Sequence, residues 1–370
     1  AEGVEARVMA AIAAVTAAAA ASTVPRRAER CLHLGPVGSP DCFAPRAAAA
    51  AARSVKARRA VLPALTAAVA AARAAAAGRR ARAAATATAA AAAGGGAYVD
   101  VHCHLTHASY EGVVGEDRAV DRARAAGLAR IIVNGLDPES NRAVTALCAR
   151  HPDVLRPALG IYPLNASAGA IDAEEFRSRL NFDPPEAIDL AAEIGHIDSQ
   201  AAAGHLAAVG EAGLDGMYGY SPLLMGAQEE VLRELCRVAR RRSLPIIVHS
   251  RAAEKRVFEV LQDEGVELAD FHCYMGKKKL AVEIADAGYY LSIPSVVKRN
   301  QQFQVLCRAL PLSRLLTETD APYLAPEKGA WPNEPSTVPA GVAAIAEARG
   351  EPLAEVRAQI MENYSRLFRE

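Results

Sequence analysis

The chain has 370 residues, of which 51% are hydrophobic and 23% are charged. This composition excludes a wholly disordered protein, because enough apolar residues are present to form a large core. Seven cysteines, an odd number without regular spacing, exclude a disulfide scaffold and favour a reducing compartment.

The formal net charge of zero is the sum of two unlike segments. Residues 1–96 hold 13 Lys and Arg against 4 Asp and Glu, a net charge of +9, and 41 of these residues are Ala. The other 274 residues hold 29 bases against 38 acids, a net charge of −9. The composition therefore predicts an Ala/Arg-rich leader or extension at 1–96 and a separate domain at 97–370.

Two interpretations of residues 1–96 stay open. A basic, acid-poor, Ala-rich leader is typical of an organelle transit peptide, although serine is scarce and no cleavage site is evident. The other interpretation is a disordered or partly helical extension, since Ala favours helix over residues 62–93 but buries too little area for a core. The compartment follows that choice, organellar for a transit peptide and cytoplasmic otherwise. The uncharged stretch 8–25 is long enough to span a membrane, but its alanines supply too little transfer energy, so we expect no membrane partner.

Short β-rich runs recur after residue 96. Their starts lie about 20 to 50 residues apart, too far for hairpins and suitable for helical crossovers between parallel strands. The sequence predicts eight such strands, at 98–101, 130–134, 156–161, 207–211, 245–249, 269–272, 289–292 and 315–318.

Helix signals fill the gaps between these runs. Pro138 opens a predicted helix at 138–150, directly after Asp137 as an N-cap. Two further helices are predicted at 226–242 and at 277–287, the second ending at Gly288. Eight strand–helix units predict an α/β fold, a (β/α)8 barrel of the TIM type. A doubly wound open sheet is the alternative, but no Gly-rich phosphate-binding fingerprint follows the first strand.

The active site of such a barrel lies at the carboxyl ends of its strands. Taken singly, a His or an acid there is as well explained by a core or rim position. Here side chains that can bind metals stand at that end of five strands: His102, His104, Glu211, His249, His272 and Asp320. Together they predict a site for two divalent ions bridged by Glu211, an arrangement suited to hydrolysis.

Six short motifs resemble the TatD family of metal-dependent deoxyribonucleases, within the amidohydrolase superfamily. They are VDVHCHL at 99–105, AVGEAGLD at 208–215, LPIIVHSR at 244–251, FHCYMG at 271–276, LLTETDAPYL at 315–324 and NEPSTVP at 333–339. The resemblance covers nearly all of residues 98–369, with the motifs in the family's order.

The resemblance implies a division of the predicted ligands between two metals. His102, His104 and Asp320 would hold one ion, His249 and His272 the other, with Glu211 shared. Glu211 and Asp320 would be the catalytic residues, Asp320 by accepting the proton of the attacking water. The family is known for magnesium-dependent cleavage of DNA, including removal of nucleotides from 3′ ends. We therefore expect two Mg²⁺, with Mn²⁺ or Zn²⁺ as alternatives.

Four further residues are predicted to contact the substrate. Tyr162 stands where the family usually has a His, in Gly-Ile-His-Pro, so the departure concerns substrate preference. Arg251 directly follows a ligand strand, and Lys277 opens a run of three lysines. Asn333 lies on the loop after Asp320, near the only tryptophan, Trp331. The competing interpretations are a solvated helical turn for the lysines and packing on the barrel rim for the loop.

Three function classes follow from these observations. The first is a deoxyribonuclease of the 3′–5′ exonuclease type acting on single-stranded DNA ends, as a monomer or weak oligomer. The second is a metal-dependent hydrolase of a small amide, lactone or phosphoester. The third is a non-catalytic binding protein on an inherited barrel, against which the six intact ligands argue. The sequence does not separate the first two classes.

Overall fold

The computed structural model describes residues 97–111, 114–217 and 221–370. The predictions for residues 1–96, including the helix at 62–93, lie outside the described residues. Eight strands form one parallel sheet in which each strand pairs with the next in the sequence. The strands are β1 (Tyr98–Cys103), β2 (Leu128–Asn134), β3 (Leu155–Ile161), β4 (Ala208–Asp215), β5 (Ile246–Arg251), β6 (Ala269–Phe271), β7 (Tyr290–Pro294) and β8 (Leu315–Glu318).

The sheet curls until β8 meets β1. Thr317 Oγ1 donates to the carbonyl of Val99 at 2.7 Å, and the amide of Asp320 donates to the carbonyl of His102 at 2.9 Å. A parallel bridge joins Cys103 to Ala321 just beyond the strand ends. The prediction of a (β/α)8 barrel is confirmed, and the strands and helices of the barrel alternate along the chain as expected.

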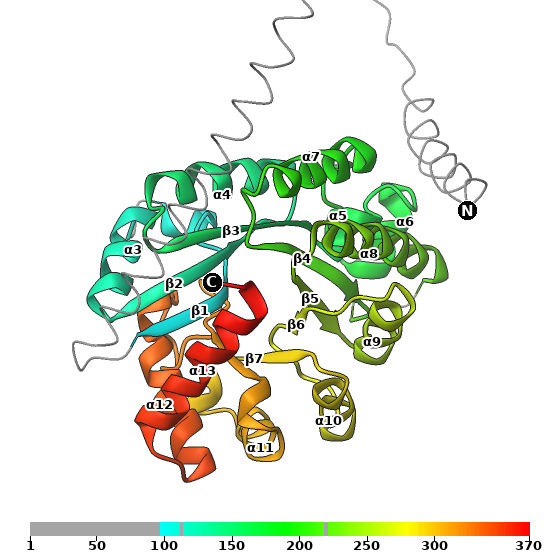
Figure 1. Ribbon diagram of the computed structural model, residues 1–370. Helices are drawn as coiled ribbons and strands as arrows, with labels where there is room; N and C mark the ends of the chain where they lie inside the picture. Colours follow the sequence, from blue (N-terminus) through cyan, green and yellow to red (C-terminus); the bar gives the residue numbers. More distant parts are fainter. Residues whose placement is uncertain (1–96, 112–113, 218–220) are drawn as a thin grey trace, which may run out of the picture.

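The helices lie outside the ring of strands (Figure 1). They are α3 (Glu116–Ala125), α4 (Pro138–Arg150), α5 (Pro163–Ser167), α6 (Ala173–Leu180), α7 (Leu190–Ala202), α8 (Pro222–Arg242), α9 (Glu254–Asp263), α10 (Lys278–Asp286), α11 (Gln301–Ala309), α12 (Val338–Arg349) and α13 (Leu353–Phe368). Short 3-10 turns lie at Ala108–Tyr110, Ser295–Lys298, Leu312–Arg314 and Pro335–Thr337. No described helix has the length and apolar composition needed to cross a bilayer.

Local chemistry explains where the predicted helices begin. Asp137 caps α4 by accepting from the amide of Ser140, while Ser140 Oγ accepts from the amide of Asp137 in return. Helix α8 begins at Pro222, four residues before its predicted start, because proline at a first helical position costs no hydrogen bond. Helix α10 ends two residues before Gly288, whose φ of 100° ends the helical path.

Two glycines allow the strands that carry the site to approach closely. Gly213 on β4 has a φ of 153°, and a Cβ there would overlap the carbonyl oxygen of His249 on β5. A Cβ on Gly160 of β3 would similarly overlap the backbone of Glu211. Both neighbours of these glycines are predicted metal ligands, so the small residues fix the spacing of the strands at the site.

Candidate metal centre

All six predicted metal ligands meet at the carboxyl ends of the strands. His102, Glu211 and His249 lie on β1, β4 and β5, whereas His104, His272 and Asp320 lie on the residues just after β1, β6 and β8. His102, His104, Glu211 and His272 are buried, and the other two are half-buried. The barrel therefore gathers side chains that are up to 218 residues apart in the sequence, from His102 to Asp320.

Glu211 lies at the centre of this group, with each carboxylate oxygen facing one pair of histidines. Its Oε2 lies 3.4 Å from His102 Nε2 and 3.3 Å from His104 Nε2. Its Oε1 lies 2.9 Å from His249 Nδ1 and 3.1 Å from His272 Nε2. Each trio of donor atoms falls within 4.8 Å, a spacing that could hold a metal ion.

Asp320 is a fourth candidate ligand beside the trio of His102, His104 and Glu211. Its Oδ1 lies 3.8 Å from His102 Nε2 and 3.7 Å from His104 Nε2. Burial raises the pKa of the Asp320 carboxyl, against the opposing effect of the nearby histidines. Burial also favours protonation of Glu211, but four surrounding histidines outweigh it and hold the pKa of Glu211 well below its usual range. Glu211 is thus an anion in a buried site, which requires cationic partners.

The donor atoms fit divalent ions. His102 Nε2 and His104 Nε2 are 3.1 Å apart, and His272 Nε2 is 3.4 Å from His249 Nδ1. Two imidazole nitrogens that ligate one tetrahedral zinc at about 2.1 Å lie about 3.4 Å apart, so each pair has the spacing of a shared ion. Histidine nitrogens combined with carboxylate oxygens suit Zn²⁺, Mn²⁺ and related ions.

The second ring nitrogen of two histidines has a defined acceptor. His104 Nδ1 lies 3.1 Å from the carbonyl oxygen of Asn134, which leaves Nε2 to face Glu211. His249 Nε2 lies 3.1 Å from Asp215 Oδ2, which leaves Nδ1 to face Glu211. Such outer acceptors fix the tautomer and orientation of a ligating histidine. The carboxylate of Asp215 also accepts from Arg251 Nη2 at 2.7 Å and from the hydroxyl of Tyr162 at 3.2 Å.

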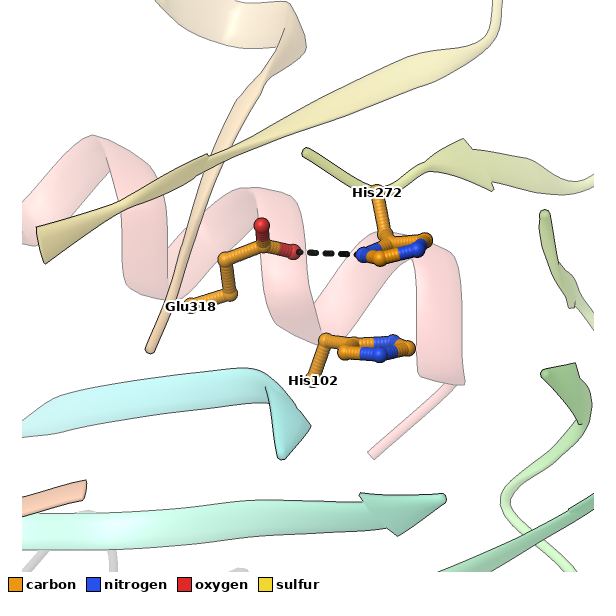
Figure 2. Close-up of side chains that lie close together, drawn as sticks. All are labelled: His102, His272 and Glu318. Atoms are coloured by element: carbon orange, nitrogen blue, oxygen red, sulfur yellow. Dashed lines mark ion pairs between the residues drawn. The ribbon is translucent and has the colours of Figure 1, made fainter. Parts of the chain in front are cut away.

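The other two histidines share a buried carboxylate on the side away from Glu211. Their rings lie stacked, with centroids 3.8 Å apart and planes 10° from parallel, and Glu318 extends toward them (Figure 2). Glu318 Oε2 lies 3.8 Å from His272 Nδ1 and 2.6 Å from Ser292 Oγ. Among the described residues, His102 Nδ1, His272 Nδ1 and Glu318 Oε1 are buried without a hydrogen-bond partner. His102, His272 and Glu318 thus form a third group whose donor atoms lie within 4.8 Å of one another.

Asp215 and Glu318 are functional candidates that the sequence analysis missed. The alternation of side chains along a strand, which puts every second residue on the same face, was a signal for both. Glu211, Gly213 and Asp215 share one face of β4, and Glu318 stands two residues before Asp320. The sequence pattern ends this strand at residue 211 and so does not place Asp215 at the site, whereas β4 continues to Asp215.

The four residues predicted to contact substrate lie in three different environments: beside the metal centre, on the surface and in the interior. Tyr162 and Arg251 adjoin the metal centre through Asp215. Lys277 is exposed as the N-cap residue of α10, and its carbonyl accepts from the Tyr274 hydroxyl. Asn333 is only 2% exposed, and its amide nitrogen donates to the carbonyls of Thr319 and Tyr323. These hydrogen bonds stabilise the loop after β8 from its inner side, while a contact between Asn333 and substrate stays a prediction.

Comparisons with known proteins give one consistent result. Residues 99–369 match a family model described as TatD related DNase. The chain is 31% identical over 276 residues to human deoxyribonuclease TATDN3, covering 73% of this chain and 94% of that protein. It is 32% identical over 278 residues to the uncharacterized metal-dependent hydrolase YabD of Bacillus subtilis, covering 73% and 98% of the two chains. The crystal structure of YjjV, a TatD homolog from Escherichia coli, aligns with a TM-score of 0.61 at 25% identity, covering 74% and 98%.

Proposed function

The chain belongs to the TatD family of metal-dependent hydrolases, and on that premise we propose that it is a deoxyribonuclease acting at single-stranded 3′ ends. The observation that carries the proposal is the position of Glu211, whose two oxygens face two separate pairs of histidines. Such a carboxylate suits two divalent ions rather than one, as two-metal hydrolysis of phosphodiesters requires.

The six residues would divide between the two ions as the motifs imply. His102 and His104 face one oxygen of Glu211 with Asp320 beside them, and His249 and His272 face the other. Two bound Mg²⁺ ions, with Mn²⁺ or Zn²⁺ as substitutes, would supply Lewis acidity and an activated water. Two such ions would also add positive charge at the mouth of a domain whose net charge is −9.

Asp320 is the residue placed to accept a proton from the attacking water. It stands at the open side of the site, with a side-chain exposed fraction of 16% against 3% for Glu211. Its carboxylate, half-buried beside His102 and His104, could take that proton as a general base. Glu211 is inaccessible and held by four histidines, so its part is to position the ions.

Arg251 is the cation best placed for a substrate phosphate. Its guanidinium is held by Asp215 at 2.7 Å, yet the side chain is 40% exposed. An anchored guanidinium can bind a phosphate oxygen without first losing the flexibility of a long side chain. Tyr162, which also contacts Asp215, would border the same pocket, and Lys277 would meet the strand farther from the centre.

The proposal is tested with single-stranded oligonucleotides labelled at either end and incubated with Mg²⁺, Mn²⁺ or Zn²⁺. We expect stepwise shortening from the 3′ end that stops on chelation. Glu211→Ala and Asp320→Ala should abolish this activity without unfolding the barrel, whereas Glu230→Ala, an exposed acid on α8, should leave it unchanged. Metal-loaded protein that leaves DNA intact but hydrolyses small amides, lactones or phosphoesters would contradict the proposal and favour the second function class.

A further inference from the structure

Exposed apolar side chains collect around the mouth of the barrel. Among the described residues, eight large apolar side chains are exposed. Five of them lie on the connections that leave the carboxyl ends of β4, β6 and β8, or on the first helical turn after them: Met217, Leu223, Met275, Tyr323 and Trp331. Large apolar groups kept in water at the mouth indicate a ligand with apolar surface of its own.

Three of the rings near the mouth form a continuous row. His107, on the connection after β1, has its ring centroid 5.6 Å from that of Tyr323, with planes at 74°. The Tyr323 hydroxyl lies 3.2 Å from His107 Nε2. The Trp331 ring centroid is 5.7 Å from that of Tyr323, and the two planes are tilted by 54°. We call His107, Tyr323 and Trp331 the aromatic row.

The aromatic row is tied to the metal-facing residues by the backbone. The amide of Tyr323 donates to the carbonyl of Asp320 at 2.8 Å, and the amide of His107 donates to the carbonyl of His104 at 3.0 Å. Three residues of chain reach at most about 11 Å, so the backbones of Tyr323 and His107 stand close to the residues that face the metals. Asn333 holds the carbonyl of Tyr323 at 2.7 Å, which fixes the loop between Tyr323 and Trp331 at both ends.

We propose that the aromatic row is a stacking site for the nucleobases of a single-stranded DNA end whose phosphodiester lies at the metal centre. This inference rests on the proposed function and assigns the part of the substrate that the metals do not bind. Tyr323 and Trp331 are 44% and 57% exposed, so each retains ring surface for a ligand. Stacking on aromatic side chains is how proteins hold single strands without reading sequence.

The net charge of the domain favours such a contact. With a net charge of −9, residues 97–370 repel a polyanion everywhere except near local cations and bound metals. Attraction to successive phosphates therefore supplies little affinity beyond the scissile linkage. Base stacking adds affinity that does not depend on a basic surface.

Trp331 provides a direct readout, because it is the only tryptophan in the 370 residues. Metal-loaded protein is titrated with a short oligothymidylate whose linkages are cleavage-resistant phosphorothioates. A second oligonucleotide carries abasic residues at its two 3′-terminal positions. We expect the first to quench the fluorescence of Trp331 and the second to bind more weakly with little quenching.

Variants then separate stacking from a structural role of the loop. Turnover is measured with the same two sequences made with ordinary phosphodiester linkages, called the normal and the abasic oligonucleotide. In Tyr323→Leu and Trp331→Leu, kcat/KM for the normal oligonucleotide should fall between about fivefold and a hundredfold, toward the value for the abasic one. The value for the abasic oligonucleotide should change much less, because the lost contact was already absent. Val305→Ala, which trims an exposed apolar side chain on α11, should change neither value.

The outcomes distinguish this inference from the proposed function. Cleavage of both oligonucleotides with equal kcat/KM in the wild type overturns the stacking site and leaves the deoxyribonuclease intact. Quenching by the normal oligonucleotide without any cleavage supports the stacking site and overturns the proposed activity. Neither quenching nor cleavage overturns both.

Discussion

Asp215 determines which nitrogen of His249 faces the metal centre. Burial opposes a charge on His249, but hydrogen bonds to Asp215 and Glu211 prevail and raise its pKa to about 9 in the metal-free protein. The carboxylate that accepts from Nε2 keeps Nδ1 directed at Glu211. Asp215→Asn should therefore weaken metal binding about ten- to a hundredfold, the usual effect of losing an outer acceptor.

The loss is measured by competition with a chromogenic chelator. Asp198→Asn is the matched control, since this aspartate accepts from Arg241 and Arg242 on the surface. The control should bind metal as the wild type does. Equal affinity in Asp215→Asn and Asp198→Asn would show that His249 is oriented without Asp215.

Replacing Glu318 by Gln should stabilise the metal-free protein and at the same time weaken metal binding. The carboxylate is fully buried, and its Oε1 has no hydrogen-bond partner among the described residues. Glu318→Gln removes this buried acid at similar volume, so the free energy of unfolding of the metal-free protein should rise by about 1 kcal/mol or more. Metal affinity should fall about tenfold, because His272 loses the carboxylate that lies 3.8 Å from its Nδ1.

Denaturant unfolding in the presence of chelator measures the first quantity, and calorimetric titration with Mn²⁺ measures the second. Glu318→Asp, which keeps the charge on a shorter side chain, is the conservative comparison. A fall in both quantities for Glu318→Gln would mean that Glu318 supports the barrel in general and does not act on the histidines.

At the scale of elements, Glu370 links the segment after α13 to two neighbouring strands. Its carboxylate oxygens lie 2.7 Å from Arg130 Nε on β2 and 2.7 Å from Arg156 Nε on β3. Burial would raise the pKa of Glu370, but the two guanidinium groups outweigh it and lower the pKa. Glu370→Gln should lower the free energy of unfolding by about 2 kcal/mol near neutral pH, because buried hydrogen bonds to charged groups are lost.

The sign of the pH dependence follows from the lowered pKa. A carboxyl with a depressed pKa stabilises the fold above its ordinary value, 4.5 for Glu370, and loses that effect as pH falls through the lower folded value. The difference between wild type and Glu370→Gln, measured by urea unfolding with chelator, should therefore shrink toward zero in acid. Glu362→Gln, which breaks the exposed pair with Arg366 on α13, should have a small effect at every pH. A constant difference for Glu370→Gln would exclude the ion pairs as its cause.

The elements differ in how far the sequence could predict them. All eight strands were predictable because each is a buried apolar run, and β8 and α4 have their predicted bounds. The start of α8 had a local signal in Pro222, which the prediction did not use, whereas the end of β4 depends on a tertiary contact. Residues 212–215 pair with β5, and that pairing extends β4 to Asp215. The six predicted ligands followed from strand ends, whereas the outer carboxylates depend on which buried atoms meet across the barrel.

At the scale of the whole molecule, the described residues between 97 and 370 form a nearly closed barrel with a single principal core. Strands β1 to β8 and the helices from α3 to α13 except α6 contribute to it, and the family match at 99–369 falls within the same bounds. We predict that a protein beginning at residue 97 unfolds cooperatively and retains metal-dependent activity. The measurements are thermal unfolding followed by circular dichroism and hydrolysis of the single-stranded oligonucleotide, both against the full chain.

The KM of the full chain and of the protein that begins at residue 97, each measured at a low and a high salt concentration, decides whether the basic segment takes part in binding DNA. Residues 1–96 carry a net charge of +9 and could attract DNA to a domain of −9. Such an attraction is screened within about 10 Å at 0.1 M salt, so it would lower the KM of the full chain mainly at low salt. If the metals and the aromatic row supply the binding, the two proteins should have the same KM at both concentrations. A KM for the shorter protein that is higher at low salt and converges at high salt would assign the +9 segment a role in holding DNA.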